Sequence, residues 1–562
     1  MTRLRICGGN ERGDLELADN KQKNNYADRE DGKRSYSCGQ NVCNYTVEFC
    51  TSGTIHGIRY FGENRTYIEK LWWAISITLS LYFCVSLIIS AYVRWENSPV
   101  IVSFATKETP VWMIPFPAVT ICPESKTRPS VFNYTYYLHK KQDNETLTDD
   151  EERKFGYLSF VCDKKPGLVY RSGKYAGEDM LEFLESVQPN FYEGASNCKY
   201  LGVRYNCSEL FVPILTDDGI CYTFNIVDRT QLLSDIVIHY KNFHKTKVSH
   251  DWDLEHGYHP SVGLEAYPRR ALYAGIPYAL EISLTEHEDD LDYTCGSSVK
   301  GWKVQISHPQ RMPRVRNQHF IVPLARVAKA GIAPDMMTTS AAVKAYNAKR
   351  RNCHFPSERS LKYFKVYSQN NCAIECRANY TYSQCGCVPF YVPREKGVPI
   401  CGAESHHCLK KAISMYQKSK IQSGWIQKKI DGMNNEDSEH KDLPDCKCLP
   451  ICTAMYYNVE NTQANWDWVS TFKYNRQSGV DISDTKRKMS MLQVFFKGNQ
   501  FINSERNELY GSTEFLANVG GLLGLFIGFS ALSLVEIIYY LTLRILCNIK
   551  MFGRRNWSGK VD

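Results

Sequence analysis

The residues best placed to do chemistry lie in an apolar segment near the C-terminal end, residues 515–543. Small and polar residues recur there at close to helical spacing: Gly520, Gly524 and Gly528 at every fourth position, and Asn518, Gly521, Leu525 and Gly528 at about every 3.5 residues. A helix with this pattern has one side with little bulk. Two interpretations stay open: a seam where helices pack closely, or several copies around an axis that expose backbone carbonyls to ions.

The tripeptide Gly528-Phe529-Ser530 favours the second interpretation. Glycine and serine can break helical hydrogen bonding and turn carbonyl and hydroxyl oxygens inward, which a membrane tolerates only where the backbone is buried in protein or lines water. Glu536 follows and is the only Asp, Glu, Lys or Arg in the segment. It is a candidate to attract cations to the inner mouth of a pore, and the alternative is that its side chain snorkels to the membrane interface.

These residues need a membrane and a partner helix to position them. Residues 71–93 provide one: 23 uncharged residues that would span about 34 Å, enough for a hydrocarbon core of about 30 Å. Beyond 543 the basic residues outnumber the single Asp562, which places that end in the cytoplasm. We therefore expect a multi-pass plasma-membrane protein with both termini cytoplasmic: residues 1–70 cytoplasmic, 71–93 and 515–543 transmembrane, 94–514 extracellular, and 544–562 cytoplasmic.

Composition excludes several classes of protein. The 562 residues are 43% hydrophobic, which excludes a disordered chain, while a mean hydropathy of −0.39 argues against many membrane spans. A net charge of +8, from 68 basic and 60 acidic residues, gives no reason to expect a nucleic-acid partner. We find no GxSxG, HExxH or phosphate-binding loop, so we expect no enzyme and no cofactor.

The cysteines support an extracellular middle region. Sixteen of the 22 lie within 94–514, an even number suited to disulfides: Cys122, Cys162, Cys198, Cys207, Cys221, Cys295, Cys353, Cys372, Cys376, Cys385, Cys387, Cys401, Cys408, Cys446, Cys448 and Cys452. Zinc ligation would need reduced thiolates, so we predict disulfides and no metal site, with the pairing left open. The same region holds four possible N-glycosylation sites: Asn133, Asn144, Asn206 and Asn379.

Within 94–514 the patterns indicate a mixed α+β fold. Residues 236–240, 278–284 and 302–306 are rich in apolar and β-branched residues and predict strands, residues 335–350 and 410–429 predict helices, and 353–452 is expected to be loop-rich. An acidic run at 286–292 and five histidines (His239, His244, His250, His256 and His259) could sense protons or bind a divalent metal. The alternative is a solvated loop.

Several motifs, taken in order, resemble the degenerin/epithelial sodium channel family, and specifically its insect pickpocket branch. They are His56-Gly57, FPAVTICP from Phe116, GICYTFN from Gly219, GWKVQISHP from Gly301, NNCAIECRANYTYSQCGCVPFYVPR from Asn370, PICG from Pro399, CKCLPIC from Cys446, and GGLLGLFIGFSALSLVEIIYYL from Gly520. No single piece is decisive, but their order and spacing are specific, and they cover nearly the whole chain.

The resemblance implies a homo- or heterotrimeric, voltage-independent, sodium-permeable cation channel that amiloride blocks. Its ectodomain would have a β-sheet palm, a knuckle, a finger and a cysteine-braced helical thumb. Gly528, Phe529 and Ser530 would form the selectivity filter, with Asn518, Gly521, Leu525 and Glu536 lining the pore. His56 and Gly57 would belong to a cytoplasmic gating motif, and Ala517 would be the position where a bulky side chain holds the channel open.

Two departures from the family pattern and two alternatives remain. Phe529 replaces a small residue, and Tyr539 stands where relatives often have an acid, so the preference for sodium over potassium stays open. A purinergic-type trimer shares the topology but would need a basic cluster for nucleotide phosphates. A non-conducting receptor or accessory subunit is the other alternative. The sequence leaves the extracellular ligand and the stimulus open: force, osmolarity, a peptide, a cuticular lipid or acid.

Overall fold

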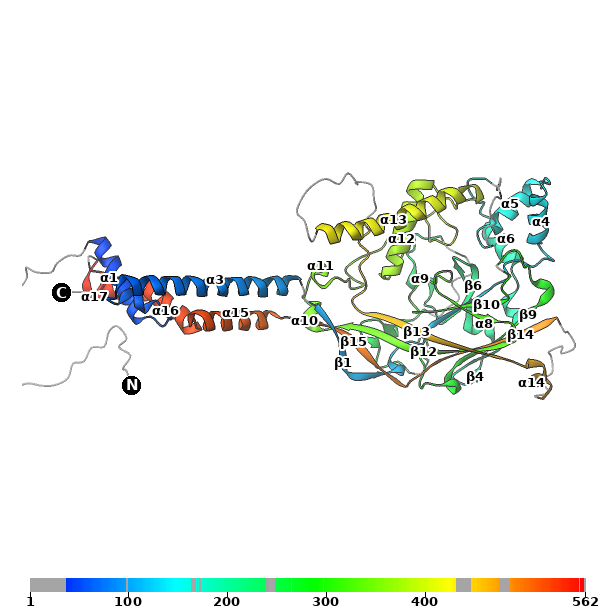
Figure 1. The fold of residues 1–562 in the computed structure, drawn as a ribbon. Coiled ribbons are helices and arrows are strands. Elements are labelled where there is room, and N and C mark those ends of the chain that lie inside the picture. Colours follow the sequence, from blue (N-terminus) through cyan, green and yellow to red (C-terminus); the bar gives the residue numbers. More distant parts are fainter. Residues whose placement is uncertain are drawn as a thin grey trace, which may run out of the picture. The chain divides into compact units, whose positions relative to one another are not determined.

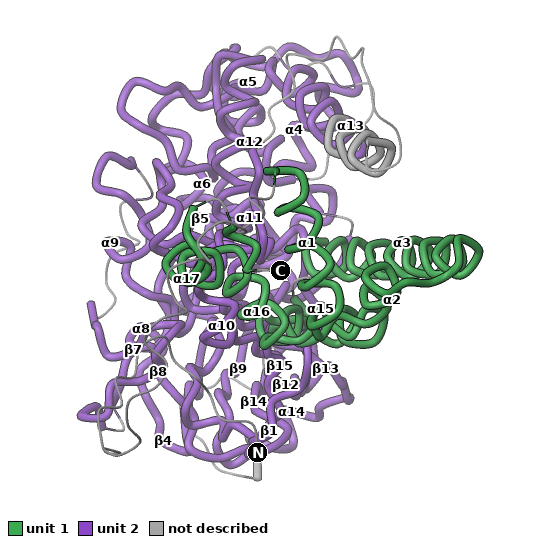
Figure 2. The backbone as a smooth tube through the Cα atoms, turned by 90° about the vertical axis from the view of Figure 1, so that its left-hand side faces the viewer, with its two compact units in different colours: residues 1–101, 508–562 green, residues 102–507 purple. Residues whose placement is uncertain are grey.

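A computed structural model describes residues 37–97, 100–162, 168, 170, 173–238, 240, 248–263, 265–296, 298–430, 446–474, 486–554 and 556–559. The chain divides into two compact units, residues 1–101 with 508–562, and residues 102–507 (Figure 2).

The first unit is helical. Its elements are α1 (Cys38–Ser52), α2 (Arg59–Gly62), α3 (Tyr67–Asn97), α15 (Ser512–Ile527), α16 (Ala531–Leu541) and α17 (Leu543–Phe552). An N-terminal and a C-terminal helix meet here, because α3 and α15 pack side by side (Figure 1). Among the described residues, two helical stretches are long and apolar enough to cross a membrane, Tyr67–Asn97 and Ala531–Phe552, and Ser512–Ile527 is a shorter apolar helix.

The apolar segment 515–543 is not one continuous helix, because the chain breaks between α15 and α16. Gly528 ends α15 in the left-handed conformation, with φ of 70°, where glycine pays no Cβ penalty. Ser530 then begins α16 through a capping box: its hydroxyl accepts from the Ser533 N–H at 3.3 Å, and its own N–H donates to the Ser533 hydroxyl at 3.2 Å. Glycine and serine thus break the helix as the sequence predicts.

The second unit is built on two sheets. The larger has the strand order β1-β15-β12-β14-β9-β3-β4, with β13 also paired to β12, and the smaller has the order β11-β10-β2-β6-β5; β7 and β8 form a separate pair. The strands are β1 (Val100–Pro110), β2 (Ala118–Pro123), β3 (Ala195–Tyr200), β4 (Val203–Arg204), β5 (Phe211–Thr216), β6 (Gly219–Phe224), β7 (Trp252–Asp253), β8 (Gly257–Tyr258), β9 (Leu280–His287), β10 (Gly301–Ser307), β11 (Phe320–Pro323), β12 (Arg326–Thr339), β13 (Ala454–Asn465), β14 (Arg487–Phe496) and β15 (Gln500–Glu508). Phe116, Phe224 and Phe496 pack edge to face in the core that joins the sheets.

Helices and short turns cover these sheets (Figure 1). They are α4 (Tyr134–Gln142), α5 (Asp149–Leu158), α6 (Met180–Val187), α7 (Phe191–Gly194), α8 (Cys207–Leu210), α9 (Arg229–Leu232), α10 (Ala341–Lys344), α11 (Ala348–Arg351), α12 (Gln369–Cys385), α13 (His406–Ile430) and α14 (Trp468–Tyr474), with 3-10 turns at Val111–Met113, Ile276–Tyr278, Glu288–Asp290 and Ala403–Ser405. The longest pair, α12 and α13, lie against each other and carry much of the disulfide framework.

All sixteen predicted cysteines form disulfides. The eight bridges are Cys122–Cys221, Cys162–Cys295, Cys198–Cys207, Cys353–Cys452, Cys372–Cys448, Cys376–Cys446, Cys385–Cys408 and Cys387–Cys401. Two of them tie α12 to the segment before β13, and Cys385–Cys408 ties α12 to α13. These helices therefore have covalent as well as packing support, which a loop-rich region needs.

The structure confirms some predicted elements and corrects others. The strands at 278–284 and 302–306 are β9 and β10, and the helix at 410–429 lies within α13. The helix predicted at 335–350 is wrong: β12 continues to Thr339 because its backbone pairs with β13 from Arg326↔Asn465 to Met337↔Ala454, and only short turns of helix follow. The strand at 236–240 is also wrong, since only Ile238 makes a bridge, to Arg394, and residue 239 lies outside the described residues.

Candidate functional site

The helix break is in direct contact with the segment that precedes α2. The His56 N–H donates to the Ile527 carbonyl at 3.1 Å, at the end of α15. A Cβ on Gly528 would lie 1.6 Å from the His56 Nδ1, a severe overlap with the imidazole ring. A glycine is therefore needed at position 528 for two reasons: the backbone has a positive φ there, and the His56 ring leaves no space for a Cβ. The structure brings the predicted gating motif and the predicted filter tripeptide together.

The Glu536 carboxylate is held by the same segment. Its Oε2 accepts hydrogen bonds from the Thr54 N–H at 3.1 Å and from the Thr54 hydroxyl at 2.7 Å. The Thr54 hydroxyl also lies 2.9 Å from that of Ser533, which is buried. Hydrogen bonds that an ionised carboxylate accepts are among the stronger ones in proteins, so this contact fixes both partners. Sequence reasoning missed Thr54, because nothing near it in the sequence points to a partner so distant along the chain.

Gly57 fits the same segment against the first apolar helix. It has φ of +87°, and a Cβ would lie 2.9 Å from the Ile77 Cδ1. Close by, the rings of Tyr60 and Trp73 stack with their centroids 4.1 Å apart. The segment 53–58 is thus fitted between α3 on one side and α15 with α16 on the other, and its glycine is needed where the backbone approaches α3.

Helix α1 fastens the N-terminal side to the C-terminal helices. The Tyr45 hydroxyl donates to the Tyr540 carbonyl at 2.5 Å, and Glu48 forms an ion pair with Arg544 at 2.7 Å. The Phe49 ring meets the Tyr540 ring edge to face. Sequence reasoning assigned α1 no role, although its Tyr45, Glu48 and Phe49 at spacings of three and four are the residues that a packed helix face would show.

The other predicted pore residues lie on an open face of α15. Ala517 and Asn518 are exposed, Leu525 is 80% exposed, and a Cβ on Gly521 would meet nothing within 4 Å. The Asn518 amide donates to the Tyr510 hydroxyl. A face this bare within one chain leaves room for another helix or for water, so both interpretations of the small-residue pattern remain compatible with the geometry.

The acidic run holds one buried carboxyl. Glu286, near the end of β9, is 5% exposed, and neither oxygen has a hydrogen-bond partner. Burial, reinforced by the nearby Glu124 and Asp290 carboxylates, raises the pKa of Glu286 to about 8, against the opposing charges of Lys300 and Lys126. This part of the run is therefore not a solvated loop.

The predicted metal interpretation finds no site in the described residues. No group of three or more His, Cys, Asp or Glu side chains in that part of the chain could hold a metal ion. His239 and His244 lie outside the described residues, whereas exposed His256 contacts Asp253 at 3.0 Å. The four predicted glycosylation sites, Asn133, Asn144, Asn206 and Asn379, are all exposed, and their modification stays a prediction.

Two helical stretches apolar enough to cross a membrane, a helix break braced by the N-terminal segment, and a disulfide-rich α+β domain are consistent with a membrane channel subunit, and the family match shows that class. The chain belongs to the amiloride-sensitive sodium channel family, whose sequence model matches residues 49–540. Members are plasma-membrane channels that carry sodium and assemble from subunits, not enzymes. The predicted family and fold class are confirmed, and the purinergic-type alternative is set aside.

Individual relatives agree over nearly the whole length. The chain is 27% identical to pickpocket protein 28 of Drosophila melanogaster, over 91% of this chain and 80% of the relative. It is 24% identical to the sodium channel protein Nach of the same species, over 90% and 88%, and 23% identical to human acid-sensing ion channel 2, over 88% and 85%.

Proposed function

We propose that this chain is a pore-forming subunit of a voltage-independent, amiloride-sensitive, sodium-permeable cation channel of insect sensory or epithelial cells. Three subunits, identical or related, surround the pore, with both termini cytoplasmic and residues 94–514 extracellular. Stimuli act through that extracellular domain. The family match and the names of the relatives support this proposal.

The observation that carries the proposal is the broken helix and its brace. A gap in helical hydrogen bonding within an apolar segment is costly unless the freed backbone groups are satisfied or face water. Here the Ile527 carbonyl accepts from the His56 N–H, and Ser530 caps the next helix. A break supported in this way by a second segment is suited to a filter whose width a cytoplasmic segment controls.

In this proposal each part of the site has a separate role. Gly528, Phe529 and Ser530 present backbone and hydroxyl oxygens to the ion. Asn518, Gly521 and Leu525 line the outer part of the pore, with Ala517 beside the gate. Glu536 attracts cations to the inner mouth, and His56 with Gly57 transmits movement of the N-terminal segment to the filter.

The test is expression of the chain alone and with related subunits, recorded under voltage clamp at several potentials with and without amiloride. Gly528→Ala should abolish or greatly reduce the sodium current while surface expression persists, because the added methyl group overlaps His56 and the positive φ is lost. Gly39→Ala is the matched control, since a Cβ at Gly39 meets nothing within 4 Å. An unchanged current in Gly528→Ala would contradict the proposal.

A second candidate function is that of an accessory subunit that conducts only with a partner. An inward Phe529 ring would favour it, because a bulky side chain in the filter tripeptide would then obstruct the axis of a homotrimer. Silence of the chain alone, with current restored by a related subunit and altered in selectivity by Ser530→Ala, would support this role over the homomeric channel.

A further inference from the structure

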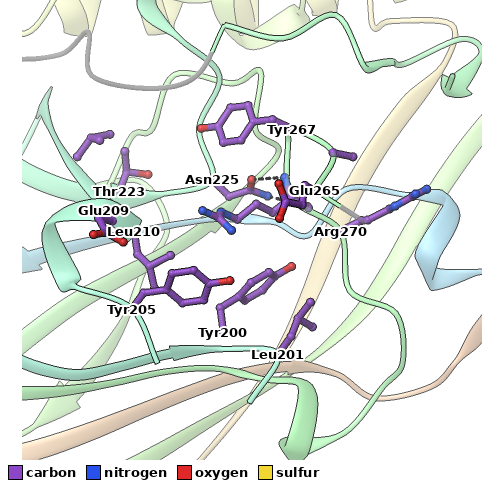
Figure 3. Close-up of a pocket in the computed structure, with 13 residues that line it drawn as sticks. Tyr200, Leu201, Tyr205, Glu209, Leu210, Thr223, Asn225, Glu265, Tyr267 and Arg270 are labelled. Atoms are coloured by element: carbon purple, nitrogen blue, oxygen red, sulfur yellow. Dashed lines mark hydrogen bonds between the residues drawn. The ribbon is translucent and has the colours of Figure 1, made fainter. Parts of the chain in front are cut away.

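The second unit contains a pocket of about 580 Å³ that no pore function uses. Its walls come from β3 and the turn after it, from α8 and the start of β5, from β6, and from the loop at 265–270. Figure 3 shows Tyr200 and Tyr205 on one side, with Asn225, Tyr267 and Glu265 on the other. A cavity of this size is typical of sites for small organic ligands.

The walls of the pocket are held in place. Asn225 clamps the loop, because its Oδ1 accepts from the Arg269 N–H at 2.6 Å and its amide donates to the Arg269 carbonyl at 3.1 Å. The Tyr258 hydroxyl donates to the Pro268 carbonyl at 2.6 Å. On the opposite side the Cys198–Cys207 disulfide closes the turn that carries Tyr205. The pocket is therefore formed before any ligand arrives, which lowers the entropic cost of binding.

Two neighbouring arginines have different surroundings. The Arg270 guanidinium donates to the carbonyls of Val262 and Gly263, at 3.0 and 2.7 Å, and lies over the Tyr258 ring. The Arg269 guanidinium lies over the rings of Tyr205 and Tyr200, at 5.3 and 5.9 Å, and within the described residues it has no hydrogen-bond acceptor and no carboxylate partner. Arg269 is thus a half-buried cation in a cavity with its donors available to an anion.

Two exposed carboxylates limit which anion can enter. Glu209 and Glu265 line the same pocket, and neither has an ion pair within the described part of the chain. They would repel a phosphate ester or another polyanion, while a purely apolar ligand would leave the Arg269 guanidinium unpaired and desolvated. A ligand with one carboxylate and one ammonium group can pair with the arginine and with a glutamate at the same time. Tyr205, Leu201 and Leu210 offer apolar contact for its side chain.

We propose that this pocket binds a zwitterionic amino acid with an apolar or aromatic side chain. The carboxylate pairs with the Arg269 guanidinium, the ammonium group pairs with Glu209 or Glu265, and the side chain lies against Tyr205 and Leu210. Such a ligand would join the 265–270 loop to β3, which belongs to the same sheet as β9, β14 and β12. Ligand binding at this pocket is separate from ion conduction and can be measured without recording a current.

The test is calorimetric titration of the purified full-length chain in detergent with L-phenylalanine. 3-Phenylpropionate, which lacks the ammonium group, and phenethylamine, which lacks the carboxylate, are the comparison probes. We expect L-phenylalanine to bind, and each analogue to bind about tenfold more weakly or worse, because each leaves one charged partner unpaired. Absence of L-phenylalanine binding up to about 10 mM, or equal affinity for all three probes, would overturn the proposal.

Variants assign the contacts. Arg269→Gln should weaken L-phenylalanine binding by about tenfold or more, and the double variant Glu209→Gln/Glu265→Gln should bring its affinity down to that of 3-phenylpropionate. Arg153→Gln, an exposed arginine outside the pocket, is the matched control and should bind normally. Arg269→Lys keeps the charge and should retain most of the affinity. The thermal unfolding midpoint of Arg269→Gln without ligand, compared with that of the wild type, separates lost binding from misfolding. Unchanged affinity in Arg269→Gln would refute the carboxylate site.

Discussion

The buried Glu286 carboxyl predicts a specific pH dependence of stability. In the unfolded chain its pKa is close to 4.5, and in the folded chain it is raised to about 8. Below about pH 4.5 the Glu286 carboxyl is protonated in both the folded and the unfolded chain, so its contribution to stability is fully present. As the pH rises from 4.5 to 8 the folded chain still holds the proton and the unfolded chain does not, so the stabilising contribution of the protonated Glu286 carboxyl falls, and none of it remains above pH 8.

The magnitude follows from the linkage relation. Where the folded chain holds one more proton than the unfolded chain, the free energy of unfolding falls by about 1.4 kcal/mol for each pH unit. Raising the pH from 5.5 to 7.5 therefore lowers the free energy of unfolding by about 2.7 kcal/mol. Glu286→Gln keeps the shape and stays neutral at every pH. Its stability relative to the wild type should therefore rise by about 2.7 kcal/mol between pH 5.5 and pH 7.5.

The assay is thermal unfolding of the full-length protein in detergent between pH 5 and 8.5, comparing wild type and variant at each pH so that other titrating groups cancel. The charged groups that act on Glu286 are Glu124, Asp290, Lys300 and Lys126, and Lys488 stands opposite it on β14. Glu288→Gln, an exposed carboxyl of the same run, should leave the profile unchanged. Parallel profiles for wild type and Glu286→Gln would refute the reasoning.

Three further predictions concern the channel. Ala517→Trp should give a sodium current at rest, measured by voltage clamp, because Ala517 is exposed on α15 and accepts bulk within the chain; a wild-type resting current would contradict its gating role. Cys372→Ser should lose surface expression, measured by surface biotinylation, because the bridge to Cys448 closes a long loop. Thr54→Val should lower the sodium current at unchanged surface expression, since it removes the hydrogen bond to Glu536, which contributes about 1–3 kcal/mol. Adding Glu536→Gln should then cost little more, and additive losses would show that the two residues act separately.

Features set by local chemistry could be predicted from the sequence. The break at Gly528 and Ser530 depends on a glycine that tolerates positive φ and a serine that caps the next helix, and both are local properties. The disulfide cysteines were predictable from their number and compartment, but not their pairing, because sixteen cysteines allow a very large number of arrangements.

Features set by distant contacts could not be predicted. The stretch around Met336 has helix-forming residues, yet it is a strand because β13 and β15 supply hydrogen-bond partners from far along the chain. The contact of His56 with Gly528 is of the same kind, since a His-Gly pair alone indicates only a turn. The pocket around Arg269 also depends on tertiary packing, and its residues form no motif.

Glu536 shows how such a contact changes a functional argument. From the sequence the choice lay between a free carboxylate at the inner mouth and a side chain that snorkels to the interface. The hydrogen bonds from Thr54 give a third arrangement, in which neutral donors hold the carboxylate without cancelling its charge. Within the proposed channel it still attracts cations, so the acid that Tyr539 replaces is not needed for that purpose. Its position, however, depends on the N-terminal segment that also carries His56, so a stimulus that moves this segment should change the proposed filter and the position of this charge together.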